Sequence, residues 1–377
     1  MTGRSRLIEG VKTSIGAFVG DFARGPADKA VHVSDLGSFE RRFGGPRSTS
    51  EASYAVRQFF GNGGAEAWVV RVKGHRRRSP DAAAMIGSID LGTGMQALRD
   101  VGGFNILCIP DAARLSAGMV SVYESAVQLC ESEGAFLIVD IGPDVTDVND
   151  VKVWLADLGI TSSHAAAYFP RILVEGPLDG FKERSFGASG TMAGVYARTD
   201  AEHGVWKAPA GVEAQLRGVH GLSHALTDAG QDALNRLGVN GLRRFPVHGE
   251  VAWGARTLDG ADSRASEWKY VPVRRFALFL EESLYRGTEW AVFEPNDEPL
   301  WSELRATVET FMRELFGQGA FPAATPRDAY FVRCDRTTTT QGDIDAGIVN
   351  IVVGFAPLKP AEFIILRIQQ NASPDSP

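Results

Sequence analysis

Cysteines and long apolar segments are scarce in this sequence. Cys108, Cys130 and Cys334 are an odd number, stand far apart and lie in apolar runs, which favours reduced core thiols over disulfides or a metal cluster. No stretch approaches the roughly 18 uninterrupted apolar residues of a membrane span. Residues 1–22 carry charged side chains and lack the apolar region of a signal peptide. We therefore expect a protein that is made and kept in the cytoplasm, without direct membrane insertion.

The chain also lacks an excess of positive charge and the common nucleotide-binding motifs. Its net charge is -7 and its pI is near 5.6, so it has no electrostatic reason to bind nucleic acid. No Walker loop is present, and the glycines of GASGTMAG (187–194) do not follow the Gly-x-Gly-x-x-Gly order. We expect no cofactor. What the chain does have is 44% hydrophobic residues over a length that suits two or three globular domains.

The first two thirds of the chain alternate apolar strands with amphipathic helices. Strands are predicted at 14–22, 65–74, 104–111, 135–142 and 168–176, and helices at 54–64, 115–131 and 147–159. A strand-helix-strand alternation of this kind predicts a parallel sheet that is covered by helices on both faces. The fold class expected for this region is therefore α/β.

The texture of the sequence changes after residue 250. Helices are predicted at 271–287 and 297–319, and strands at 329–335, 347–357 and 362–369. Pro272 and Pro299 lie in the first turns of the two helices, and Asp297 is placed to cap the second. Helices packed on one side of a small, largely antiparallel sheet form an α+β domain. The boundary between the two regions is expected within residues 251–268.

The segment FGASGTMAGVYA (186–197) raises the question of a catalytic serine, because subtilisin-type proteases carry their nucleophile at a helix start of this kind. Ser189 begins a predicted helix, and Asp140 ends a predicted parallel strand, where α/β sheets place functional groups. A triad also needs an oriented base, and His164, the nearest candidate in order, lies in an alanine-rich approach to a strand. The pattern favours Ser189 as a helix cap, with small residues that allow close packing of helix on sheet.

A pair of histidines has the spacing of a zinc-binding helix. His220 and His224 are separated by four positions, but no glutamate lies between them and no third ligand is evident. The pair is more typical of a turn followed by a helix start. We expect no metal site and no catalytic site.

Several ordered sequence blocks resemble the tail sheath proteins of contractile phage tails and related contractile injection systems. The blocks are TSIGAFVGDFARGP (13–26), FERRFGG (39–45), YAVRQFFGNGG (54–64), KAPAG (207–211), WGARTL (253–258), EWKYVPVRR (267–275), FEPNDEPLW (293–301), AYFVRCD (329–335) and GFAPLKPAEFIILRI (354–368). Together they extend over nearly the whole chain, which makes a chance similarity implausible.

The resemblance implies a fold and a function. It implies an N-terminal arm segment at 1–18, a non-catalytic α/β domain with a subtilisin-like parallel sheet at 19–250, and an α+β sheath assembly domain at 251–377. Sheath subunits form a helical homopolymer around an inner tube and contract to drive the tube through a target envelope. The implied partners are copies of the same chain, the inner tube protein, baseplate and tail-terminator or cap proteins, and sheath paralogues. The assembled protein would be part of a phage tail or a phage tail-like particle.

The N-terminus departs from the family pattern. Sheath proteins commonly start with an extended arm that carries a Pro-Gly-Val-Tyr-like strand before the segment matched here by LIEGVKTSIGAFVG (7–20). This sequence begins at MTGRSR, so we expect the donated N-terminal strand to be shortened or missing.

The last strand has the features of an arm donated to another subunit. Pro357 and Pro360 hold the preceding linker extended, so the strand at 347–357 cannot turn tightly into the segment AEFIILRIQQ (361–370). A terminus so apolar needs a defined partner. The family resemblance names that partner as the sheet of an adjacent subunit, reached by strand addition. The residues expected in the subunit contact are Phe363, Ile364, Ile365, Leu366, Arg367 and Ile368.

Two other classes of function remain open at this stage. A divergent serine hydrolase would use Ser189 and would react with a fluorophosphonate probe. A ligand-binding α/β protein would work as a monomer or dimer and would not form large, concentration-dependent polymers.

Overall fold

The computed structural model describes residues 7–74, 81–99, 101–176 and 182–362. No helix in this part of the chain combines the length and the apolar character that a membrane span requires. Cys108, Cys130 and Cys334 are buried and free of disulfides, as predicted.

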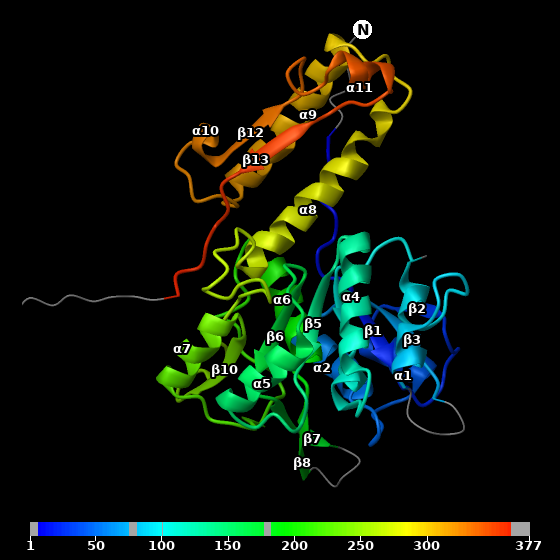
Figure 1. The fold of residues 1–377 in the computed structure, drawn as a ribbon, viewed down its shortest axis with the longest axis vertical. Helices are drawn as coiled ribbons and strands as arrows, with labels where there is room; N and C mark the ends of the chain where they lie inside the picture. Colours follow the sequence, from blue (N-terminus) through cyan, green and yellow to red (C-terminus); the bar gives the residue numbers. More distant parts are fainter. Residues whose placement is uncertain (1–6, 75–80, 100, 177–181, 363–377) are drawn as a thin grey trace, which may run out of the picture.

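The molecule has two parts, which Figure 1 shows one above the other. Residues 15–270 form the body, which is built around a large sheet, and residues 271–356 form the lobe. The long helix α8 (Val271–Thr288) leads out of the body into the lobe. The N-terminal segment, residues 7–14, runs from the lobe into the first strand of the body.

Eight strands form the sheet of the body. In spatial order they are β11 (Gly249–Ala252), β10 (Asn240–Phe245), β6 (Ala165–Phe169), β5 (Phe136–Asp140), β4 (Ile106–Cys108), β1 (Gly16–Gly20), β3 (Ala67–Arg71) and β2 (Ala30–Val33). The strands from β10 to β3 pair in parallel, and an antiparallel strand closes each edge. The prediction of a parallel sheet is therefore confirmed.

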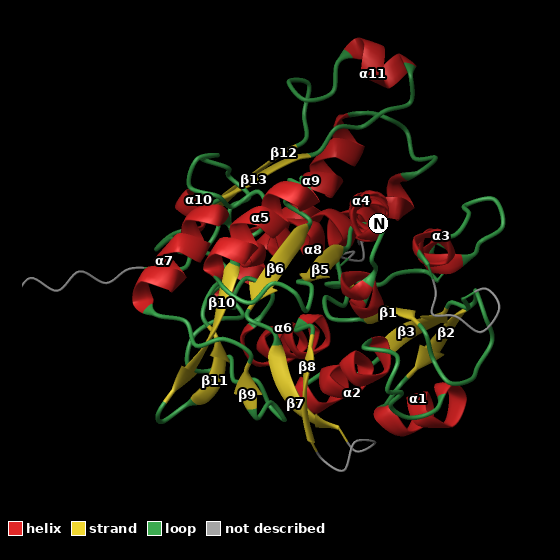
Figure 2. Ribbon diagram, turned by 60° about the horizontal axis from the view of Figure 1, so that its bottom comes forward, coloured by secondary structure: helices red, strands yellow, loops and turns green. Residues whose placement is uncertain are grey.

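Helices cover both faces of this sheet (Figure 2). One face carries α1 (Leu36–Phe43), α2 (Ala52–Asn62) and α6 (Ser189–His203), and the other carries α3 (Ala82–Ile86), α4 (Met119–Glu133), α5 (Val148–Leu158) and α7 (Asp228–Leu237). The alternation along β1 shows how a strand serves both layers: Phe18 joins the core on the first face, while Ala17 and Val19 join the core on the second. Short 3-10 turns occur at Gly94–Leu98, Pro110–Arg114 and Glu289–Ala291.

The predicted single strand at 168–176 is wrong. The parallel strand β6 ends at Phe169, and the chain starts a new strand, β7 (Ile172–Gly176), after Pro170. β7 pairs antiparallel with β8 (Lys182–Phe186) and β9 (Gly221–Leu222) in a separate sheet. Pro170 has no N–H to donate to a ladder, so it separates two strands whose apolar residues read as one run.

The predicted domain division at residue 250 falls inside β11. The chain beyond β11 also packs on the body. The Leu258 N–H donates to the Ala165 carbonyl over 2.7 Å, and Arg256 and Tyr270 form an isolated antiparallel β-bridge. The division into residues 1–18, 19–250 and 251–377 stays a prediction.

The lobe consists of helices and a two-stranded antiparallel sheet. Its elements after α8 are α9 (Glu298–Gly317), α10 (Pro326–Ala329), β12 (Tyr330–Arg333), α11 (Gln341–Asp345) and β13 (Val352–Phe355). Asp297 caps α9 by accepting the Leu300 N–H over 3.3 Å, as predicted. The two long helices share a core through Phe276, Leu280, Val308, Phe311 and Leu315.

Candidate functional site

The structure brings the predicted pair Asp140 and Ser189 together at the carboxyl end of β5. The Ser189 N–H donates to Asp140 Oδ1 over 2.8 Å, and the Ser189 hydroxyl donates to Asp140 Oδ2 in a very short hydrogen bond. The serine is therefore not the cap of α6, as the sequence suggested. The residue at the cap position is Ala188, which has no side-chain cap bond. The carboxylate of Asp140 accepts the helix N–H instead, and this is favourable because a helix start attracts negative charge.

The third candidate, His164, lies at the opposite end of the parallel strands, directly before β6. Asp140 pairs with Tyr168, which is four residues after His164, so the two candidates are about 13 Å apart along the strands. His164 Nε2 instead lies 2.8 Å from Arg274 Nη2. Burial, followed by the charge of Arg274, lowers the pKa of His164 to about 4. The histidine therefore has neither the position nor the basicity of a general base for Ser189.

A buried ion pair completes the polar network around Asp140. Arg171 Nη2 donates to Glu51 Oε1 over 2.5 Å, and each of the two side chains is 2% exposed. The other carboxylate oxygen of Glu51 accepts the Gly187 N–H over 2.8 Å, and Arg171 also donates to the Ile141 carbonyl over 2.6 Å. The pair thus joins the start of α2, the approach to α6 and the end of β5. Sequence reasoning missed both residues.

A second buried carboxylate, Asp111, holds the start of α2 from the other side. Its Oδ1 accepts the N–H groups of Glu51 and Ala52 over 2.6 and 3.2 Å, and its Oδ2 accepts the Asp21 N–H over 2.8 Å. Burial raises the pKa values of Asp111 and Asp140 to about 6, and the charge of Glu51 adds to both shifts. With 0% exposure of Ser189 and 2% exposure of Asp140, the network is closed to solvent. Its geometry suits joining secondary structure elements better than reacting with a substrate.

The small residues of GASGTMAG serve a contact between two helices. A Cβ atom on Gly190 would lie 2.3 Å from the Ala55 carbonyl oxygen, and one on Gly194 would lie 2.5 Å from Asn62 Cβ and from the Phe59 carbonyl oxygen. These neighbours are on α2, so the two glycines allow α6 to approach α2 closely, while α6 also packs on the sheet through Met192 and Tyr196. The motif that resembles a catalytic helix start is thus explained by backbone packing.

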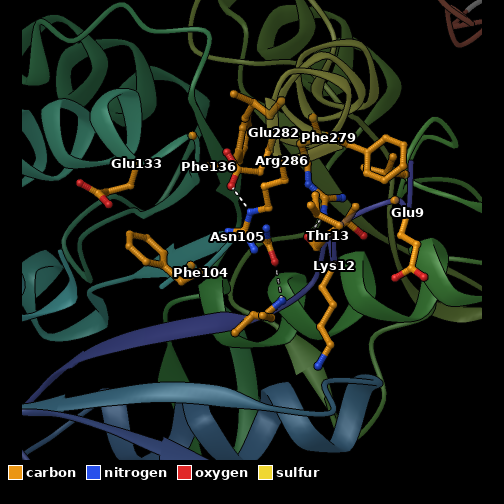
Figure 3. Close-up of a pocket in the computed structure, with 18 of the residues that line it drawn as sticks. Glu9, Lys12, Thr13, Phe104, Asn105, Glu133, Phe136, Phe279, Glu282 and Arg286 are labelled. Atoms are coloured by element: carbon orange, nitrogen blue, oxygen red, sulfur yellow. Dashed lines mark hydrogen bonds and ion pairs between the residues drawn. The ribbon is translucent and has the colours of Figure 1, made fainter. Parts of the chain in front are cut away.

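A cavity of about 580 Å³ lies where the N-terminal segment passes between the body and α8 (Figure 3). Its polar lining is largely engaged in internal contacts: the Ile15 N–H donates to Asn105 Oδ1 over 3.0 Å, and Arg286 pairs with Glu282 over 2.5 Å. Lys12 forms an ion pair with Glu66. The cavity marks the junction of body and lobe and has no convergent set of free polar groups.

The two histidines with the spacing of a zinc-binding helix, His220 and His224, do not lie on one helix. His220 lies 3.8 Å from Glu175, and the ring of His224 contacts Phe169. The short strand β9 lies between them, so the spacing of four does not fall on a helix. Among the described residues there is no cluster of three or more histidine, cysteine, aspartate or glutamate side chains that could hold a metal ion.

The lobe has an open apolar groove between α8 and β13. The groove has a volume of about 500 Å³, and its lining includes Leu284 and Tyr285 of α8 and Ile351, Val353 and Phe355 of the chain at β13. In the described part of the chain β13 pairs with β12 and with no other strand. The other edge of β13 therefore has no strand beside it in the described part of the chain, and the groove lies between β13 and α8.

After β13 the chain leaves the lobe. The Ala356 N–H donates to the Ala329 carbonyl over 2.8 Å, and the C-terminal segment, residues 357–362, then reaches the body. There Glu362 forms a two-pronged ion pair with Arg256. The predicted contact residues Phe363, Ile364, Ile365, Leu366, Arg367 and Ile368 lie outside the described residues.

Comparisons with known proteins identify the family. The sequence profile of the phage tail sheath C-terminal domain matches residues 263–371. The tail sheath protein of Vibrio phage KVP40 is 28% identical over 180 residues, which are 48% of this chain and 26% of that protein. A putative prophage major tail sheath protein of Pseudomonas aeruginosa (strain UCBPP-PA14) is 26% identical over 330 residues, or 81% of this chain and 77% of that protein.

A solved structure extends the match to nearly the whole chain. The helical sheath of the anti-feeding prophage in its contracted state is 30% identical, with a TM-score of 0.79, and the match covers 97% of this chain and 96% of that one. The chain belongs to the tail sheath protein family. The resemblance read from the sequence is confirmed, and the sheath fold combines α/β content with a largely parallel sheet. The chain described here spans about a quarter of the length of the Vibrio phage tail sheath protein that it matches.

Proposed function

We propose that this chain is the structural subunit of a contractile sheath. In this proposal it polymerises helically around an inner tube, and a change in the packing of the whole lattice drives the tube through a target envelope. Its partners would be further copies of the same chain, the inner tube protein, and the baseplate and cap proteins. The solved relative is a helical sheath in a contracted state, which supports this role.

The observation that carries the proposal is the unfilled groove beside β13. An extended strand placed there would add a third strand to a two-stranded sheet and would cover the apolar side chains of Leu284, Tyr285 and Val353. Sheets of two strands are marginal alone, and a third strand or a packed helix stabilises them. Each backbone hydrogen bond gained would contribute about 1 kcal/mol net.

The occupant we propose for the groove is the segment 361–370 of an adjacent subunit. Ile364, Leu366 and Ile368 alternate along this segment, so one apolar face would enter the groove while the backbone pairs with β13. The same segment of its own subunit starts from Glu362, which is bound to the body rather than to the lobe. This starting point favours an intermolecular link.

We also propose that the body is a non-catalytic relative of the subtilisin fold. Support comes from the parallel sheet, from Asp140 at a strand end and from Ser189 at the start of a helix. Ser189 is fully buried, its hydroxyl donates to Asp140, and His164 lies beside Arg274 at the other end of the strands, so Ser189 lacks the oriented base of a catalytic triad. A fluorophosphonate probe should leave Ser189 unlabelled in the folded protein, and labelling would restore the hydrolase alternative.

Removal of residues 363–377, with Glu362 retained, tests the sheath proposal. We expect the truncated subunit to keep its circular dichroism spectrum and thermal transition but to lose polymers in sedimentation and negative-stain microscopy. The substitution Leu366→Lys should act in the same way, because it places a charge in the apolar groove. Sheaths of normal length from either variant would contradict the donated strand. Unfolding of the truncated monomer would assign the segment to the core of its own subunit.

A further inference from the structure

The C-terminal segment is attached to the body through Glu362, whose main partner is Arg256. Arg256 Nε donates to Glu362 Oε1 and Arg256 Nη2 donates to Glu362 Oε2, each over 2.6 Å. This is the parallel, two-bond geometry in which arginine and carboxylate groups fix both distance and direction. Glu362 is also the residue directly before the predicted contact residues 363–368. The ion pair therefore lies where the proposed arm, residues 363–370, would begin.

Arg256 is held in place independently of Glu362. The side chain is 1% exposed, and its third nitrogen, Nη1, donates to Asp262 over 2.9 Å and to the Gly260 carbonyl over 3.2 Å. It also donates to the Asn235 carbonyl in a very short hydrogen bond. Because the guanidinium is rigid and planar, these contacts orient the two remaining donors before Glu362 arrives.

Glu362 makes the polar contacts of this segment. The Tyr270 hydroxyl donates to its Oε2 over 3.1 Å, and Lys269 Nζ lies 4.0 Å away. The preceding residues Pro357, Leu358 and Pro360 are half-buried, and a cavity of about 630 Å³ lies beside them. The hydrogen bonds that join the described part of the segment to the body therefore converge on Glu362.

We infer that Arg256 and Glu362 form an anchor that sets the place and direction in which the arm leaves the subunit. The inference rests on the proposed function and adds a positioning role to it. Arg256, Asp262 and Tyr270 all belong to the body, whereas the groove that would receive an arm belongs to the lobe. Each link in the polymer therefore joins the body of one subunit to the lobe of the next.

The substitution Glu362→Gln tests the anchor, because it keeps the shape of the side chain and removes its charge. Arg256 remains paired with Asp262 in this variant, so the body should fold and melt as in wild type. We expect a spin label attached at Ala361→Cys of the free subunit to become more mobile when Glu362→Gln is added; Ala361 is exposed, and the native Cys108, Cys130 and Cys334 are buried. The lowest protein concentration that supports polymers should rise about tenfold, the effect of losing one charge-assisted hydrogen bond.

Lys359→Gln is the matched control. It removes an exposed charge from the same segment, three residues before the anchor, and should change neither the mobility of the label nor polymer formation. Unchanged label mobility and polymer formation in Glu362→Gln would overturn the anchor. If the 363–377 deletion still fails to polymerise, the sheath proposal survives that result. Polymers formed by the deletion variant would instead remove the donated arm, whatever Glu362→Gln does.

Discussion

The sheets of the body and the lobe differ in how completely they are covered. All five residues are buried in each of β1, β5 and β6, where helices pack on both faces. In β12 and β13 no residue is fully buried, and the four residues of β12 alternate between half-buried and exposed. The body therefore supplies its own core, while the lobe has a surface that a partner would complete. Stability of the subunit and assembly of the polymer are expected to depend on different residues.

The largest expected effect on the body comes from Arg171→Leu. The substitution leaves the buried carboxylate of Glu51 without its main partner, so the free energy of unfolding should fall by about 3 to 5 kcal/mol. Arg114→Leu is the control, because Arg114 contacts the same carboxylate over 3.2 Å but is 47% exposed. That change should cost at most about 1 kcal/mol. Urea denaturation followed by circular dichroism measures both, and equal losses would argue against a special role of burial.

The pH dependence of stability should reveal Asp140. Burial raises its pKa to about 6 in the folded protein, so its contribution to stability is fully present below about pH 4 and is lost as the pH rises through about 6. The free energy of unfolding of Asp140→Asn, relative to wild type, should therefore increase by up to about 3 kcal/mol between about pH 4 and pH 7. Urea titrations at several pH values measure this difference. A difference that stays constant with pH would show that Asp140 has an ordinary pKa.

Close packing of α2 on α6 should make Gly190 sensitive to a larger side chain. Gly190→Val places new atoms against the backbone of Ala55 and should lower the free energy of unfolding by about 1 to 3 kcal/mol. Gly61→Ala is the control, since a Cβ atom there meets nothing within 4 Å. It should stabilise α2 by up to about 1 kcal/mol. Thermal denaturation distinguishes the two signs, and a neutral Gly190→Val would mean that the two helices can separate without loss.

Tyr285→Lys in the lobe is expected to change the free energy of unfolding least of these substitutions and to prevent polymer formation. Tyr285 is 69% exposed and lines the groove, so the free energy of unfolding should change by no more than about 0.5 kcal/mol. Polymers should nevertheless be lost in sedimentation, because a charge enters an apolar site. Val153→Lys, at a 62% exposed position on α5 of the body, controls for the added charge. Equal effects of both variants would remove the distinction between groove and body.

The sequence predicted the parts of this molecule that depend on local periodicity. The parallel strands around β5, the two long helices α8 and α9, and the cap at Asp297 were all readable from spacing. Pro170 was visible too, but the apolar residues on both sides of it concealed the change of sheet. The apolar periodicity of a segment shows which of its residues will be buried, but it does not show which other strand the segment pairs with.

The buried polar contacts were only partly predictable. Asp140 was predicted at the carboxyl end of a parallel strand and Ser189 at the start of a helix, but the hydrogen bond between them was not predicted. Glu51 with Arg171 and Arg256 with Glu362 are separated by 120 and 106 positions. Charged residues at such distances carry no local signal of being paired. An arginine between apolar or small neighbours, as in WGARTL, is the kind of hint that could have pointed to a buried guanidinium.

In the described part of the chain one edge of β13 has no strand beside it, and under the proposed function this has a kinetic consequence for the cell that makes the protein. Each newly synthesised subunit would expose this edge until the proposed strand of a neighbour covers it. Wrong pairing between two free subunits depends on the square of their concentration, whereas addition to a growing end depends on the first power. A slow supply of subunits therefore favours ordered growth, and a burst of synthesis without growing ends favours aggregates.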